Sequence, residues 1–172
     1  MIFNGFCATI HGMASQEKQK FYEDATSNLL NQINKLNLTP KKKHDAVLYT
    51  RVFRELFKLD EVKQYTFVTD ENKIWDFGYD SAGFCYAASV SFAIALGIKD
   101  WQLMCIDGDK YAGRMDHHYL KHIPTGTFFD ITYDQFAVEG ITVPYELGTP
   151  AQFSLSSKDT PYRFAKAVGI LR

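Results

Sequence analysis

The fold is decided by residues 81–97, which read SAGFCYAASVSFAIALG. Small residues precede Cys85, and from there to Leu96 apolar side chains occur on every side of a helical axis. A helix that is apolar all round is buried in the centre of its domain. Gly97 suits the position after the last helical turn, where glycine adopts left-handed dihedrals at little cost. The stretch therefore predicts a central, buried helix that begins at a cysteine.

The position of Cys85 favours its reactive form. The thiolate is the nucleophilic state of cysteine, and a helix N-terminus next to a base lowers the pKa of a thiol. Backbone N–H groups of the first turn, including that of Cys85, are free to bind an oxyanion. Two downstream stretches supply partners: DHHY at 116–119 holds a candidate base, and FFDIT at 128–132 holds a candidate carboxylate, Asp130. Together they suggest a cysteine nucleophile with a histidine and aspartate pair.

The histidine and the aspartate are expected on two strands of one hairpin. Residues 117–123 and 127–131 have strand character and are joined by Pro-Thr-Gly at 124–126. Such a hairpin would set His117 beside Asp130, with the carboxylate accepting from Nδ1–H of the ring. Strand alternation sends His117 and His118 to opposite faces, so the alternation by itself leaves either residue as the base.

Length and composition indicate an ordinary globular domain. The chain has 172 residues, of which 46% are hydrophobic and 15% aromatic, enough for one substantial core without metals or disulfides. The formal net charge is −1, from 19 basic and 20 acidic residues, so no general attraction to nucleic acid or to an anionic membrane is expected.

The cysteines and the N-terminus favour a cytoplasmic protein. Cys7, Cys85 and Cys105 are odd in number and lack the spacing of a disulfide framework, which is typical of a reducing compartment. Residues 1–10 lack the basic start of a signal peptide, and no apolar run has the length of a membrane span. A toxin delivered into a target cell would show the same features.

The remaining pattern predicts an α+β domain. Apolar residues recur at helical spacing from Ser15 to Leu36, and a second helix begins at Thr39 and Pro40. Further elements are expected as strands at 64–68 and 101–106 and a last helix at 160–168. We expect one domain over 1–172, with a helical part at 1–60 and a core at 61–172 that carries the site.

The motifs around the cysteine resemble the transglutaminase-like branch of the papain-like cysteine enzymes. Gly83-x-Cys85-Tyr86 followed by Leu-Gly-Ile at 96–98, then His117-x-Tyr119 and Asp130-x-Thr, occur in the order of that family's cysteine, histidine and aspartate motifs. Tyr86 stands where the family has tryptophan or tyrosine. Tyr119 stands where the family has tryptophan. The resemblance covers about residues 81–136 and implies N-terminal helices and a buried nucleophile helix packed on an antiparallel β-sheet.

By this resemblance the catalytic residues are Cys85, His117 and Asp130, with His118 as the alternative base. The resemblance implies acyl transfer on amide bonds of a protein or peptide through a thioester, without a cofactor. Hydrolysis, by a cysteine peptidase or a protein deamidase, is the preferred outcome, and transamidation is the alternative. The expected substrate groove is lined by Trp75, Phe84, Tyr86 and Tyr119. The candidates for an oxyanion-hole side chain are Gln64, Asn72 and Trp75.

Structural roles compete with these interpretations. A lone cysteine is most often a small buried hydrophobe, and we interpret Cys7 and Cys105 in that way. A metal site at Asp116, His117, His118 and His122 is disfavoured, because their spacing is not that of zinc ligands. A binding or inhibitor protein that keeps the fold without turnover is the remaining alternative class.

Overall fold

A computed structural model shows an α+β architecture, which confirms that expectation, and it describes residues 15–67, 80–81, 83–110, 116–138, 140–156 and 159–171. The helices of these ranges are α2 (Ser15–Lys35), α3 (Pro40–Leu56), α4 (Asp60–Phe67), α5 (Cys85–Leu96), α6 (Asp134–Ala137) and α7 (Thr160–Ala167). The strands are β1 (Trp101–Ile106), β2 (His117–His122), β3 (Phe128–Phe129) and β4 (Thr149–Pro150). Short 3₁₀ turns are η1 (Ile98–Asp100), η2 (Gly108–Lys110) and η3 (Tyr145–Leu147).

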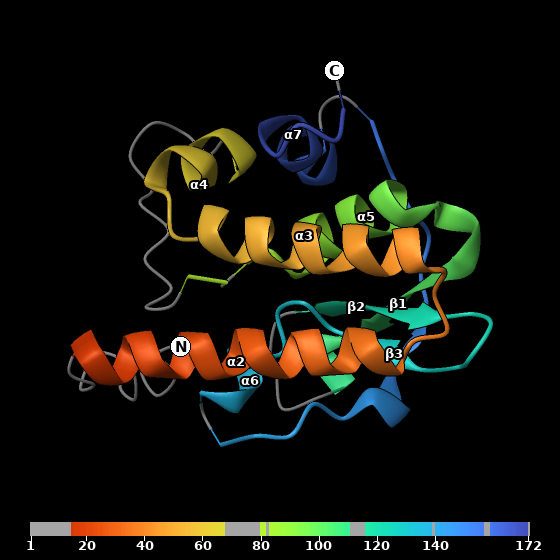
Figure 1. Ribbon diagram of the computed structural model, residues 1–172, viewed down its shortest axis with the longest axis horizontal. Coiled ribbons are helices and arrows are strands. Elements are labelled where there is room, and N and C mark those ends of the chain that lie inside the picture. Colours follow the sequence, from red (N-terminus) through yellow and green to blue (C-terminus); the bar gives the residue numbers. More distant parts are fainter. Residues whose placement is uncertain are drawn as a thin grey trace.

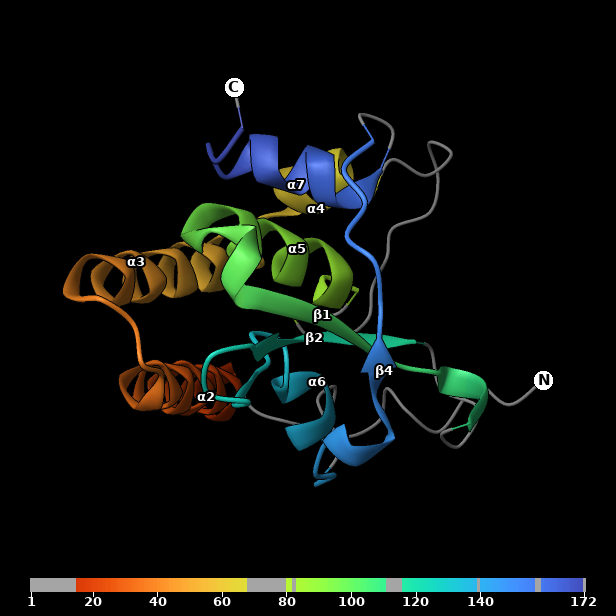
Figure 2. The same ribbon diagram turned by 90° about the vertical axis from the view of Figure 1, so that its right-hand side faces the viewer.

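The helices pack on a four-stranded antiparallel sheet of order β3-β2-β1-β4. Figure 1 shows α3 crossing above the sheet in front of α5, and α2 running below it. In the view of Figure 2, α4 and α7 lie at the top, α3 and α5 beneath them, then the sheet, and α2 with α6 at the bottom. Helix α5 is therefore enclosed between α3, α7 and strand β2, with all of which it is in contact.

The burial of α5 follows from its composition. Nine of its twelve residues are buried, and no side of the helix is polar. Gly97 ends the helix with φ of 98°, a left-handed conformation that a residue with a Cβ adopts only with strain. The expected central helix is confirmed.

Aromatic side chains fill the space between α5 and its neighbours. Phe164 of α7 is fully buried, and its ring centroid lies 5.0 Å from that of Phe53, 5.3 Å from Phe84 and 5.9 Å from Phe57. Aromatic pairs at these separations attract each other in addition to the apolar area they bury. Through this contact the C-terminal helix closes the core.

The two expected N-terminal helices, α2 and α3, are present and pack against each other. The Thr39 side chain caps α3 by accepting from the Lys42 N–H at 3.3 Å, and Pro40 occupies the first turn. Helix α2 packs along α3 and buries one apolar side, which consists of Tyr22, Ala25, Leu29 and Ile33, and Leu36 is buried directly after the helix.

Two expected elements differ from the structure. The strand expected at 64–68 is wrong, because Gln64 lies in helix α4, whose first turn carries Asp60 and Glu61. Acidic side chains at a helix N-terminus stabilise the helix. The strand preference of a five-residue β-branched pattern is too weak to outweigh this stabilisation. The strand expected at 127–131 is only Phe128–Phe129, so Asp130 follows the strand instead of lying within it.

Phe164→Ala is expected to lower the free energy of unfolding by about 3–5 kcal/mol, because it leaves a cavity among three packed rings. Leu48→Ala is the control, since that side chain is 49% exposed and its loss should change stability by less than about 0.5 kcal/mol. Urea unfolding followed by circular dichroism measures both. Equal effects of the two substitutions would contradict the central place of Phe164.

Candidate active site

Cys85 lies at the entrance of α5 and is almost covered. It is the first helical residue and is 8% exposed. The chain reaches it through a tight turn in which Gly83 has φ of 75° and the Phe84 N–H donates to the Ser81 carbonyl at 3.2 Å. The Sγ atom lies 3.8 Å from the backbone oxygen of Asp116, immediately before β2. The thiol is thus positioned where helix α5 begins and strand β2 starts.

His117 and Asp130 form a buried pair beside this thiol. The His117 Nε2 atom lies 2.7 Å from Asp130 Oδ2, and both side chains are at most 3% exposed. We expected Nδ1 to face the carboxylate, and this detail is wrong. Because β2 presents the ring with Nε2 toward Asp130, Nδ1 is the ring nitrogen that remains for an interaction with Cys85, whose pKa His117 lowers.

The second oxygen of Asp130 is held by Thr132. The Thr132 backbone N–H donates to Oδ1 at 3.1 Å and its hydroxyl donates at 3.2 Å. These bonds close a local turn directly after β3, which explains why the strand stops at Phe129. The aspartate is therefore fixed by its own turn while its other oxygen faces His117.

His118 approaches the same thiol from the other face of β2. Its ring lies 4.7 Å from the ring of Tyr86, and its backbone oxygen accepts from the Ser89 hydroxyl at 3.3 Å. His117 instead packs edge-on against Phe136 of α6 at 4.7 Å. Alternation thus separates the two rings as expected, and both still reach Cys85 because it lies at the end of the strand. Only His117 is paired with Asp130.

The histidines make the thiolate the stable form of Cys85 near neutral pH. Burial by itself raises the pKa of the thiol, but hydrogen bonds to His117 and His118 and their positive charges outweigh burial and lower it to about 6. Burial by itself would lower the pKa of His117. The charge of Asp130 and the hydrogen bond to it outweigh burial and raise the pKa of His117 to about 10. A thiolate beside an imidazolium is consequently the state between these values.

The expected groove residues divide into three cases. Phe84 is fully buried and stacks on Phe57 at 4.6 Å, so its assignment to a groove is wrong: the turn at Gly83 directs it into the core. Tyr119 is also fully buried, with its hydroxyl donating to the Tyr145 carbonyl, and does not line a groove either. Tyr86 is half-buried beside His118. Trp75 lies outside the described residues.

Of the three candidates for an oxyanion-hole side chain, one lies within the described residues. Gln64 lies in α4, and Asn72 and Trp75 fall outside the described residues. What the described residues offer next to the thiol is the N-terminal turn of α5, where the Ala88 N–H donates to the Phe84 carbonyl at 2.8 Å and earlier N–H groups precede this first helical bond.

A buried ion pair that the sequence pattern did not indicate supports the approach to Cys85. Arg54 of α3 and Asp134 of α6 are joined by Nη1 and Oδ1 at 2.8 Å, and both side chains are at most 2% exposed. The other oxygen of Asp134 accepts from the Ser81 hydroxyl at 3.0 Å. Gln135 donates to the Ser81 carbonyl, and the Tyr22 hydroxyl accepts from the Ser81 N–H at 3.1 Å. Ser81 is thereby held directly by α6 and α2, and through Asp134 it is connected to Arg54 of α3.

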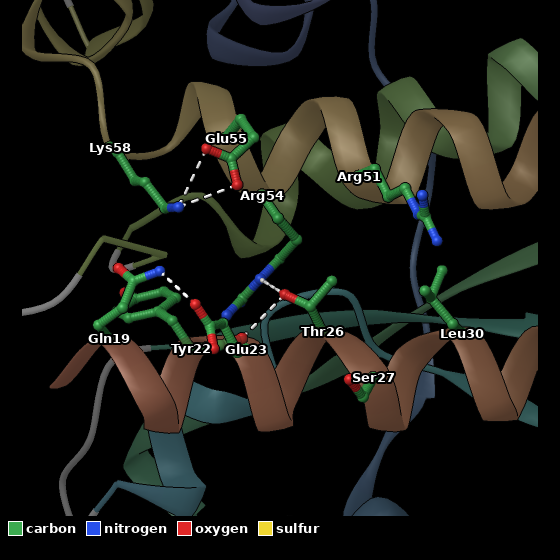
Figure 3. Close-up of a pocket in the computed structure, with 10 residues that line it drawn as sticks. All are labelled: Gln19, Tyr22, Glu23, Thr26, Ser27, Leu30, Arg51, Arg54, Glu55 and Lys58. Carbon is green, nitrogen blue, oxygen red and sulfur yellow. Dashed lines mark hydrogen bonds and ion pairs between the residues drawn. The ribbon is translucent and has the colours of Figure 1, made fainter. Parts of the chain in front are cut away.

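Arg54 also forms the floor of a cleft between α2 and α3, of about 290 Å³. Figure 3 shows its side chain extending from α3 toward Thr26, whose hydroxyl accepts from Nε at 3.3 Å. Polar groups of the cleft bond to each other: Lys58 to Glu55 at 2.9 Å, and Gln19 to Glu23 at 2.7 Å. Because both acidic and basic side chains line the cleft, its charge favours no class of ligand. It lies apart from Cys85, which is not among its lining residues.

The described residues contain neither a metal cluster nor a membrane-spanning helix. No three His, Cys, Asp or Glu side chains of these ranges come close enough together to hold a metal ion. His122, one of the four possible ligands, is turned away toward Thr125 Oγ1, at 2.9 Å, and Trp101. Within the same ranges, the helices are too short or too polar to cross a membrane.

Comparison of the chain with protein-family models, with curated proteins and with solved structures finds no match.

Alkylation of Cys85 by iodoacetamide is expected to rise as the pH increases through about 6 and then to level off, because the thiolate is the reacting species. Cys105 is the internal control, since burial and nearby carboxylates raise its pKa to about 11 and leave about one thiolate in ten thousand at pH 7. Peptide mass spectrometry after timed labelling measures both sites. An inflection for Cys85 near the ordinary thiol value would contradict an activated cysteine.

Asp134→Asn is expected to lower the free energy of unfolding by about 3–5 kcal/mol, because it leaves the charge of Arg54 buried without a counter-ion. The double variant Arg54→Met with Asp134→Asn should lose less than the sum of the single losses. Asp45→Asn, which breaks the exposed pair with Lys41, serves as the control and should leave the unfolding midpoint unchanged. Strict additivity of the two buried substitutions would contradict the coupling.

Proposed function

We propose that this protein is a cysteine-dependent acyl-transfer enzyme that acts on amide bonds of a protein or peptide through a thioester, with hydrolysis as the preferred outcome. The observation that carries the proposal is a thiol whose pKa is lowered to about 6 beside a buried histidine, which is itself paired with Asp130 at 2.7 Å. Structural cysteines are inert and keep a high pKa, as Cys105 does.

The roles follow from the contacts. Cys85 Sγ attacks the carbonyl carbon, and the first-turn N–H groups of α5 receive the oxyanion. The His117 imidazolium then gives its Nδ1 proton to the leaving nitrogen as the C–N bond breaks. In the second half, neutral His117 takes a proton from water, which attacks the thioester and releases the acid. Asp130 keeps the ring in position throughout.

His117 is preferred to His118 as the base on one geometric ground. Among the described residues, a carboxylate anchors the His117 ring and not the His118 ring, which fixes the orientation and the protonation state of His117. His118 contributes a second hydrogen bond to the thiolate. The papain-like and transglutaminase-like assignment belongs to this proposal, supported by the order of the cysteine, histidine and aspartate motifs and by a buried helix that starts at the cysteine.

A generic acyl donor, p-nitrophenyl acetate, tests the nucleophile and the base without knowledge of the natural substrate. The wild-type protein should form acetyl-Cys85, detected by intact mass, and then turn over. His117→Asn should slow turnover by about 10²–10⁴-fold, because deacylation loses its base. His118→Asn should slow it less than tenfold, and Cys105→Ala should leave it unchanged. Acetylation that persists in Cys85→Ala, or equal losses in both histidine variants, would contradict the assignment.

Casein then identifies the reaction. Cleavage indicates a peptidase, release of ammonia with a mass gain of about one unit indicates a deamidase, and incorporation of an added primary amine indicates transamidation. Each activity must disappear in Cys85→Ala. Stable acetyl-Cys85 with unchanged casein in every assay would favour a protein that binds without turnover.

A further inference from the structure

Tyr145 contacts the site from a segment to which no role has been given. It opens the turn η3, and its hydroxyl donates to Asp130 Oδ2 at 3.2 Å. This is the same oxygen that lies 2.7 Å from His117 Nε2. Since Thr132 supplies two donors to Oδ1, the carboxylate has four hydrogen-bond donors from the described part of the chain, two at each oxygen.

The hydroxyl of Tyr145 is held in place by contacts other than the one to Asp130. Its ring lies 4.8 Å from the ring of Tyr119 and 5.3 Å from that of Phe128. Its backbone oxygen accepts from the Tyr119 hydroxyl at 2.9 Å. Burial and the negative charge of Asp130 raise the pKa of Tyr145 above its ordinary value, so the phenol keeps its proton and acts as a donor.

We propose that Tyr145 is a positioning residue for the cysteine site, whose hydroxyl fixes the Asp130 carboxylate and takes up part of its negative charge. The inference rests on the proposed function. A carboxylate whose two oxygens are both hydrogen-bonded does not rotate. Because Tyr145 and His117 donate to the same oxygen of Asp130, the carboxylate also fixes the plane of the His117 ring. A carboxylate that already accepts from Tyr145 also stabilises the His117 imidazolium less.

The weaker stabilisation of the His117 imidazolium matters for proton transfer. In acylation the S–C bond forms, the C–N bond breaks, and the imidazolium gives its proton to the leaving nitrogen; Tyr145 keeps its own proton. Asp130 and Cys85 together raise the pKa of His117 to about 10, and Asp130 still acts on the ring after the thiolate has formed the S–C bond, so an unmoderated carboxylate would make the imidazolium a weaker acid than the step requires. The hydrogen bond from Tyr145 reduces the rise that Asp130 causes in the pKa of His117, without abolishing it.

Few other groups of the described residues act on His117. Cys85 faces it from α5 and Asp130 from the end of β3. Tyr119 of β2 lies parallel to the ring at 6.3 Å, and Phe136 of α6 is apolar. Replacing Tyr145 by phenylalanine keeps the packing of the ring and removes one donor, which isolates the effect on the histidine.

Tyr145→Phe is expected to raise the pKa of His117 and to slow deacylation of acetyl-Cys85 at pH 7 by about tenfold, the effect of one hydrogen bond to a charged group. NMR titration of the histidine rings between pH 8 and 11 measures the first quantity, with the His117 signal assigned by its absence in His117→Asn. Tyr133→Phe is the matched control: its hydroxyl bonds to Asn28 and Ala25 of α2, and both quantities should stay at wild-type values.

An unchanged or lowered pKa of His117 in Tyr145→Phe would overturn the inference, as would an equal rise in Tyr133→Phe. If Tyr145→Phe does not fold, Tyr145→Gln keeps a donor and Tyr145→Leu removes it, and His117 should titrate lower in the glutamine variant. Failure of the proposed function has a different signature, because wild-type Cys85 would then resist iodoacetamide and acetylation whatever the titration of His117 shows.

Discussion

The geometry around Cys85 depends on the buried ion pair between Arg54 and Asp134. These residues are eighty positions apart and connect α3 to α6, while the second oxygen of Asp134 holds Ser81. The same pair therefore positions two parts of the site: the turn that leads into Cys85, and the helix that directly follows the Asp130–Thr132 turn. Burial raises the pKa of Asp134 despite the opposite charge of Arg54, which shows how costly this placement is.

A second constraint is the complete hydrogen bonding of Asp130. A buried carboxylate with unbonded oxygens is strongly disfavoured, and here donors from a local turn, a strand and η3 meet at one group. These donors come from separate parts of the chain, and they can meet only when the sheet and the C-terminal segment are both in place. Formation of the site is thus coupled to formation of the whole fold.

The sequence predicted what depends on local pattern. The uniform apolar character of Cys85–Leu96, the capping Thr39 before Pro40 and the hairpin carrying His117 each have a short-range signature, and each is present. Gln64 was misassigned because five residues do not separate a strand from a short helix. Phe84 was misassigned because a single glycine turn decides whether that ring points to the surface or to the core.

Long-range partners could not be predicted in this way. Arg54 is one of several basic residues on an amphipathic helix, and nothing near it in the sequence distinguishes it from the exposed Arg51. Tyr145 lies in an irregular segment without periodicity, so only the folded chain reveals the contact with Asp130. The ring nitrogen that faces Asp130 depends on a side-chain rotation, on which residue spacing has no influence.

The pairing of β1 with β2 gives the two neighbouring histidines different roles. Ile106 is opposite His117 and Cys105 is opposite His118, which directs one ring to Asp130 and the other to Tyr86. A slip of β2 by a single residue would exchange the faces of both rings, so that His118 took the side of the carboxylate. The strand register, as much as the identity of the residues, therefore determines which imidazole faces Asp130, because the hydrogen-bond ladder between β1 and β2 gives two chemically identical groups different surroundings.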